Sequence, residues 1–334
     1  MGMLDWLRLI RVSGLATIAS NTIASLAMFA DDLKPYWMLA PIRHGEVRLL
    51  WVPLASFLLF ASGMLWNDIH DVERDRVLNP RRPLPSGRVS LPAAYVVGVI
   101  MSVGALFAGY MATEEHRIGF YSVGVVLSLA LLYDFSAKSI PYLGSLVMGS
   151  VRASHAVFVL LLLGPEYVKL VLGISHDPRH PPFLLSYPLI LGIYIFGVTL
   201  VSELESRRAR RWELLLGGGL MAGAVGLACV RLVRAHWIVD IMNQYQPAGP
   251  VLIAAAMTVA LVILVALVLM VSRPFLQAMK TGKQALVGST VRAALGGIIL
   301  LDALIATSGH PLAGLPILLL FPLFRMVGSF IRMD

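Results

Sequence analysis

Most of this chain consists of apolar segments close to the length that crosses a lipid bilayer. A helical span needs about 20 residues, and in lipid every backbone polar group must be satisfied internally, which long helices achieve. We expect spans at 14–30, 50–68, 91–112, 118–134, 142–163, 183–203, 213–233, 249–271, 287–307 and 311–331. Gly309, His310 and Pro311 separate the last two. The sequence therefore predicts an all-α, polytopic transmembrane bundle of nine to ten helices.

The composition agrees with a membrane protein that forms one domain. Hydrophobic residues make up 58% of the sequence and charged residues 14%, whereas a soluble domain usually has about 25% charged residues. No segment is long enough to act as a linker, so we expect a single domain over 1–334. The one cysteine, Cys229, lies in an apolar run and excludes an intramolecular disulfide.

The positive charge is distributed as in a membrane protein. The net charge is +8, which on a soluble protein would suggest nucleic acid as a partner. Here 15 Lys and Arg residues fall in alternate connections and 7 in the opposite ones. The positive-inside rule then places the N-terminus and the connections after the second and sixth spans in the cytoplasm. We therefore expect a multi-pass protein of the cell or inner membrane that contacts membrane lipid and no nucleic acid.

An acidic cluster ends the second expected span. Asn67, Asp71 and Asp75 are four residues apart, and Asp68 precedes Asp71 by three, so one helix face can carry all of them. Carboxylate oxygens suit Mg²⁺, which often joins one or two carboxylates to the phosphates of a substrate. The plainer alternative is a solvated acidic helix end.

A basic loop follows the acidic cluster. Its sequence at 79–88 is rich in Pro and Gly, which end helices, and contains Arg81 and Arg82. Arginine binds phosphate oxygens through two parallel hydrogen bonds, so both residues are candidates for substrate binding. The alternative is an ordinary basic loop on the cytoplasmic side.

Together these two segments resemble a known family. The pattern Asn-Asp-x-x-Asp-x-x-x-Asp, followed by Asn-Pro-Arg-Arg-Pro-Leu-Pro-Ser-Gly, is similar to the first aspartate-rich motif of the UbiA superfamily of intramembrane prenyltransferases. The resemblance implies a helix bundle around a central cavity and transfer of an isoprenyl group from a prenyl diphosphate to a small, often aromatic, acceptor. It also implies Mg²⁺ held by Asp68, Asp71 and Asp75, diphosphate contact from Asn67, and a catalytic role for Asp71.

Three further positions match this family. Tyr133 and Lys138 end the fourth span and are similar to its Tyr-then-Lys segment, whose lysine helps to bind diphosphate. The resemblance therefore implies catalytic roles for both. Asn21, in the first span, resembles an asparagine that faces the cavity and binds substrate. Lys138 can instead be an ordinary cytoplasmic charge, and Asn21 can serve as a hydrogen bond between helices.

The second motif departs from the family pattern. After the sixth span the family carries aspartates at helical spacing, but here the acids are Glu203 and Glu205, which do not share a helix face. Arg207 lies four residues after Glu203. The place of this segment in the family pattern makes Glu203 a candidate for diphosphate binding. Because arginine charge can replace that of a divalent cation, we expect direct diphosphate contact from arginines such as Arg207 in place of a second Mg²⁺. A helix end with solvated salt pairs is the alternative.

Three ionisable residues lie within expected spans. Arg152 and His155 share one face of the fifth span, and Asp302 lies in the ninth. Such groups usually line a cavity or pair internally. Arg152 is a candidate for binding the diphosphate, whereas His155 is expected to pack and Asp302 to pair with an arginine such as Arg292.

The function expected from these features is Mg²⁺-dependent prenyl transfer within the membrane. A CDP-alcohol phosphotransferase requires glycine directly after its first aspartate, and Ile69 follows Asp68 here. A non-catalytic protein that binds or transports isoprenoids is the second hypothesis. Diphosphate release by the purified protein separates the two.

Overall fold

The computed structural model describes residues 2–27, 48–113, 116–161, 182–205, 210–245 and 247–330. This part of the chain is helical without a strand, and eight of its helices are long and apolar enough to cross a membrane. The all-α bundle predicted from the sequence is confirmed. The helices are α1 (Met3–Leu9), α2 (Leu15–Ala27), α4 (Arg48–His70), α5 (Val72–Leu78), α6 (Leu91–Ala112), α7 (His116–Phe135), α8 (Leu143–Leu161), α10 (Tyr187–Ser202), α11 (Arg211–Val233), α12 (His236–Gln244), α13 (Gly249–Thr281), α14 (Gln284–Gly309), α15 (Gly314–Leu318) and α16 (Leu320–Phe330).

The first and the last of the ten expected spans differ from the other eight. The run at 311–331 forms the short helices α15 and α16 instead of one continuous span. Each contains a proline, Pro316 and Pro322, which lacks the backbone N–H that a helix interior uses. The run at 14–30 includes α2, which has 13 residues, and its last positions lie outside the described residues.

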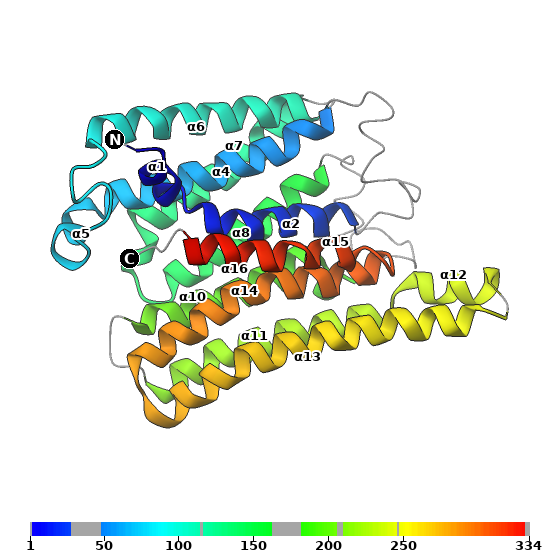
Figure 1. Cartoon of the computed structure of the whole chain (residues 1–334). Coiled ribbons are helices and arrows are strands. Elements are labelled where there is room, and N and C mark those ends of the chain that lie inside the picture. Colours follow the sequence, from blue (N-terminus) through cyan, green and yellow to red (C-terminus); the bar gives the residue numbers. More distant parts are fainter. Residues whose placement is uncertain are drawn as a thin grey trace.

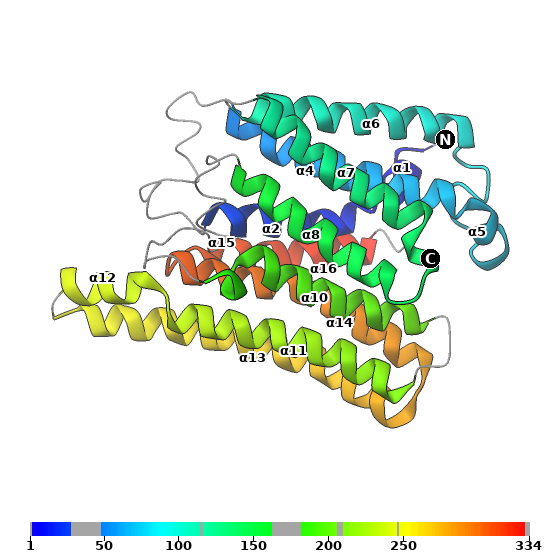
Figure 2. The ribbon, with the colours of Figure 1, turned by 180° about the vertical axis from the view of Figure 1, so that it is seen from behind.

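The helix α14 lies at the centre of the bundle. It packs against α2, α10, α11 and α13, while α10 also packs between α8 and α11, and α4 packs against α6 and α7 (Figure 1). In its most apolar stretch 78% of the residues are buried, the highest share among the eight spans. The view from behind shows α13 and α11 along one side and α6 along the other (Figure 2). The buried polar residues of α14, such as Asp302, therefore face other helices and not lipid.

Glycines allow the close approach of α10 to its neighbours. A Cβ at Gly149 of α8 would lie 2.7 Å from the carbonyl oxygen of Gly192. A Cβ at Gly197 would lie 2.6 Å from the carbonyl oxygen of Gly217 on α11. Small residues let transmembrane backbones pack in direct contact. This packing fixes the end of α10, where the second acidic segment begins.

The connections that carry the expected site lie at one end of the bundle. Figure 1 shows α5 and the start of α1 at this end, with α12 at the opposite end. The junctions of α7 with α8 and of α13 with α14, the end of α10 and the start of α11 also lie at the α5 end. The basic and acidic segments that the sequence analysis placed on one side of the membrane therefore share one end of the fold.

Candidate functional site

The acidic cluster lies where α4 passes into α5. The amide of Asp71 donates to the Asn67 carbonyl oxygen at 3.0 Å, and the amide of Asp75 donates to the Asp71 carbonyl oxygen at 2.8 Å. These bonds continue the helical repeat across the break at Asp71. Asn67, Asp71 and Asp75 therefore follow one another at one-turn intervals, as their spacing predicted.

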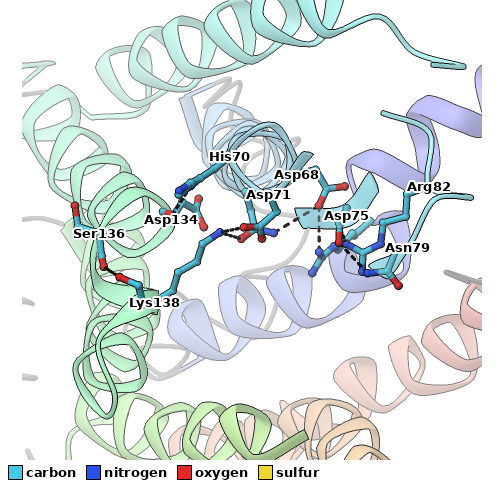
Figure 3. Close-up of polar contacts among 12 residues, drawn as sticks. Asp68, His70, Asp71, Asp75, Asn79, Arg82, Asp134, Ser136 and Lys138 are labelled. Atoms are coloured by element: carbon cyan, nitrogen blue, oxygen red, sulfur yellow. Dashed lines mark hydrogen bonds and ion pairs between the residues drawn. The ribbon is translucent and has the colours of Figure 1, made fainter. Parts of the chain in front are cut away.

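Lys138 joins this cluster from the far end of α7. Its Nζ donates to Asp71 Oδ1 at 2.8 Å and to Asn67 Oδ1 at 3.0 Å (Figure 3). The side chains of Lys138 and Asp71 are 17% and 20% exposed, so the ion pair is partly open to solvent. A cation and a carboxylate held this way can meet the phosphates of a ligand from the same side.

Local backbone structure positions Lys138. It lies in the 3-10 turn Ala137–Ser139, between α7 and α8. A Cβ at Gly144 would lie 2.9 Å from the Lys138 Cα, so only glycine lets the first turn of α8 pack against this turn. On the other side, His70 Nδ1 lies 3.2 Å from the Asp134 carbonyl oxygen, which joins the end of α4 to the end of α7 (Figure 3).

The other two aspartates each contact an arginine. Arg11 reaches Asp68 Oδ1 at 3.2 Å, and Arg82 reaches Asp75 Oδ2 at 2.5 Å. Asn79 also donates to Asp75 Oδ1 at 2.8 Å (Figure 3). The Asp68 and Asp75 side chains are 9% and 7% exposed, so Asp71 is the most accessible carboxylate of the three.

A cavity of about 660 Å³ adjoins the Arg11–Asp68 pair. Its lining comes from α1, the end of α4, the 79–88 loop and the first half of α14. The lining residues are Arg8, Arg11, Asp68, Pro80, Arg81, Arg82, Pro83, Ser86, Arg88 and Arg292. Both arginines expected from the loop, Arg81 and Arg82, therefore face this cavity.

The donor set is suited to Mg²⁺. The Asn67, Asp68, Asp71 and Asp75 side chains offer hard oxygen atoms, and Mg²⁺ often binds through one or two carboxylates together with phosphate oxygens. Among the residues that the structure describes, no three acidic, histidine or cysteine side chains come together as a complete metal site. A metal here would share its coordination with substrate, and Asp71 would be the first protein ligand. The three-aspartate set stays a prediction.

The second acidic segment, at 203–205, is hydrogen-bonded to the neighbouring helix. Glu203 accepts from Ser145 Oγ at 2.5 Å and from the Tyr142 backbone N–H at 3.3 Å. Tyr142 directly precedes α8 and Ser145 lies in its first turn, so Glu203 links the end of α10 to the start of α8. Arg207 falls outside the described residues. These two hydrogen bonds join helices, and a role for Glu203 in diphosphate binding stays a prediction.

Replacing Glu203 by Gln is expected to lower kcat/KM for prenyl transfer by less than about tenfold, or about 1.4 kcal/mol in barrier. A glutamine oxygen can still accept one of the two hydrogen bonds, so most of the link remains. The measurement is kcat/KM of purified Glu203→Gln beside Asp71→Asn. Losses of equal severity in both variants would mean that Glu203 acts on the diphosphate or its metal.

Two other predicted binding residues meet deeper in the bundle. Arg152 donates to Asn21 Oδ1 at 3.0 Å, and Asn21 donates to Asp302 Oδ2 at 2.6 Å. Asp302 also accepts from Ser20 at 2.6 Å and from the Tyr187 hydroxyl at 2.9 Å. Asn21 and Arg152 are thus brought together, but with Asp302 and not with the motif aspartates.

The expected pairing of Asp302 with Arg292 is wrong. Arg292 lies ten residues earlier on α14 and lines the arginine-rich cavity instead. About ten residues of helix separate the two by roughly 15 Å. Tyr133 is half-buried and lies within electrostatic range of Asp71, Arg11 and Glu203, beside the expected site.

Sequence reasoning missed four arginines of the cavity. Arg8 comes from α1, Arg11 from the turn that follows α1, Arg88 from the end of the basic loop and Arg292 from α14. Arg88 has a local signal, because it follows Arg81 and Arg82 in one basic loop. Arg292 has no such signal, since only the packing of α14 brings it to the first motif.

Comparison of the sequence with known proteins finds one matching family and several relatives. A model of the UbiA prenyltransferase family matches residues 22–211, more than half of the chain. The digeranylgeranylglyceryl phosphate synthase of Sulfolobus acidocaldarius is 28% identical over 59% of this chain and 77% of its own length. The enzyme of that name from Methanosarcina barkeri is 33% identical over 46% of this chain and 52% of its own. The chain thus spans about half the length of the second relative.

Solved structures show the same fold. A UbiA homologue from Aeropyrum pernix K1, solved in its apo form, aligns with a TM-score of 0.52 and 17% identity over 87% of this chain and 98% of that one. A structure described as digeranylgeranylglyceryl phosphate synthase in membranes aligns with a TM-score of 0.50 and 18% identity, covering 88% and 97%. At these identities the likeness supports the helix arrangement alone.

Proposed function

This chain belongs to the UbiA prenyltransferase family, and we propose that it binds its prenyl diphosphate at the junction of α4 and α5. As a member of the family it is an integral membrane enzyme that transfers an isoprenyl group from a prenyl diphosphate to an acceptor. The observation that carries the proposal is the contact of Lys138 with both Asp71 and Asn67. It joins the lysine segment and the first motif at one point.

The charges of this site suit an anionic leaving group. Transfer breaks the bond between the allylic carbon and the diphosphate oxygen, and the electron pair leaves with the diphosphate. Mg²⁺, when bound by Asp71 with Asp68 or Asp75, would supply positive charge to that leaving group. Lys138 donates hydrogen bonds that a phosphate oxygen can accept in place of Asp71, and Asn67 fixes the orientation of the ammonium group.

The acceptor supplies the nucleophile that forms the new bond to the allylic carbon. Its hydroxyl or carbon nucleophile attacks the allylic carbon and loses a proton to solvent or to the released diphosphate. The two relatives are named digeranylgeranylglyceryl phosphate synthases, and that name includes a phosphorylated glyceryl group. We propose an acceptor of that class for this chain, in place of the aromatic acceptor that the sequence pattern allowed.

The test is diphosphate release by the purified protein in detergent or liposomes. Prenyl diphosphates of increasing chain length are supplied with a phosphorylated glycerol acceptor, with Mg²⁺ or with EDTA. We expect release that requires both Mg²⁺ and acceptor and that yields a prenylated product by mass spectrometry. Tight binding of the prenyl diphosphate without any release would instead favour the carrier hypothesis.

The orientation of the site is a separate prediction. The surplus of Lys and Arg at the α5 end supports a cytoplasmic position for it. In a Cys229→Ala background, a cysteine at Ser86 should be labelled by an impermeant thiol reagent only from the cytoplasm. A cysteine at Asn243 on α12, at the opposite end, should be labelled only from outside. Labelling of both from one side would contradict the topology.

A further inference from the structure

The arginine-lined cavity carries far more positive charge than its neighbouring carboxylate can balance. Among the described residues that line it, six are arginines and one, Asp68, is acidic. Three arginines already contact acids: Arg11 contacts Asp68, Arg82 contacts Asp75, and Arg88 contacts Asp5 at 3.1 Å. The remaining three are Arg8, Arg81 and Arg292.

These three arginines have unused hydrogen-bonding capacity within the described part of the chain. The buried Nε–H of Arg8 has no hydrogen-bond partner there. Arg81 is exposed and forms no ion pair with a described acid. Arg292 donates to Ser289 at 3.1 Å on its own helix. The Glu205 carboxylate lies near Arg292 and interacts with it electrostatically, without a hydrogen bond or ion pair between the two in the described structure. Guanidinium groups that converge with hydrogen-bond donors still unused are suited to phosphate oxygens.

The cavity and the Lys138 cluster favour different ligands. The cluster offers Asp71 and Asn67 oxygens, which attract a divalent cation and hence a diphosphate complexed with it. The cavity is strongly positive and repels a divalent cation, so it favours an anion that arrives without metal. Asp68 and Arg11 line the cavity and adjoin the acidic cluster, so the two sites are neighbours.

We propose that this cavity binds the phosphate group of a phosphorylated acceptor, with Arg292 and Arg81 as residues that select for it. This inference rests on the proposed prenyl transfer at the neighbouring site. A cavity of about 660 Å³ has room for a small phosphate ester. With its phosphate bound in the cavity, the acceptor would place its nucleophile beside the prenyl diphosphate. An acceptor without the phosphate would leave the guanidinium groups unpaired.

The first experiment measures binding without turnover. Full-length protein in detergent with EDTA is titrated with sn-glycerol 1-phosphate or inorganic phosphate by calorimetry. We expect wild-type protein to bind without Mg²⁺, and Arg292→Gln to bind about tenfold to a hundredfold more weakly. Arg273→Gln is the matched control, because this arginine is exposed on α13 and does not line the cavity. Binding that requires Mg²⁺, or that Arg292→Gln leaves unchanged, would overturn the proposal.

The second experiment measures selectivity. In Arg292→Gln and Arg81→Gln the KM for the phosphorylated acceptor should rise about tenfold or more, with kcat and the KM for the prenyl diphosphate nearly unchanged. The same acceptor without its phosphate should lose this dependence on the two arginines. If the wild type releases diphosphate equally well with both acceptors, the inference fails while the proposed function stands. If neither acceptor gives release, the proposed function fails.

A phospholipid head group is the other source of a phosphate ester. The binding titration is therefore repeated in nanodiscs of neutral lipid and of anionic lipid. Phosphate binding that anionic lipid abolishes, with turnover equal for both acceptors, would assign the cavity to the membrane surface and overturn the acceptor proposal.

Discussion

Asp71→Asn is expected to lower prenyl transfer by about 10³-fold, which corresponds to about 4 kcal/mol in the activation barrier. Asp71 is the most accessible of the three motif carboxylates and contacts Lys138 at 2.8 Å. The substitution keeps the shape of the side chain but removes the negative charge that a divalent cation needs. It also leaves Lys138 without its anionic partner, so both halves of the diphosphate site are weakened together.

The measurement is kcat/KM for diphosphate release at saturating acceptor, with the melting temperature as a check on the fold. Glu73→Gln is the matched control, because Glu73 lies on α5, is 74% exposed and contacts only Arg76 in the described structure. We expect that control to retain nearly full activity. An Asp71→Asn enzyme with near-normal turnover would contradict the assignment of the donor site.

Asp302→Asn is expected to have the largest effect on stability, lowering the free energy of unfolding by about 3 kcal/mol. The Asp302 carboxylate is fully buried and accepts hydrogen bonds from Ser20, Asn21 and Tyr187. An amide at this position turns one acceptor oxygen into a donor that faces other donors. Through Asn21, the charge of Arg152 also loses its compensating carboxylate.

Thermal or denaturant unfolding in detergent measures this loss. Asp240→Asn serves as the control, because Asp240 is 47% exposed on α12 and pairs with His236, one turn away on the same helix. Exposed pairs of this kind contribute about 0–1 kcal/mol, so the control should unfold almost as wild type does. Equal stability of both variants would show that the network around Asp302 contributes little to the fold.

The local part of the donor site was predictable because it depends on helix geometry. Asn67, Asp71 and Asp75 lie at one-turn intervals, and backbone hydrogen bonds carry that repeat through the break at Asp71. The expectation that an apolar run forms one continuous span failed at 311–331, where two prolines divide the run into α15 and α16. Hydrophobicity alone does not register where a helix must stop.

The sequence by itself determined the membrane bundle, eight of its ten expected spans and the acidic and basic segments at their ends, because apolar length and spacing within one helix are local properties. The tertiary structure decided which distant groups meet. Lys138 contacts Asp71 across 67 positions, and Asn21 contacts Asp302 across 281. Arg292 reaches the first motif only because α14 packs at the centre of the bundle. Such meetings depend on how the helices pack, which no pattern within one segment specifies.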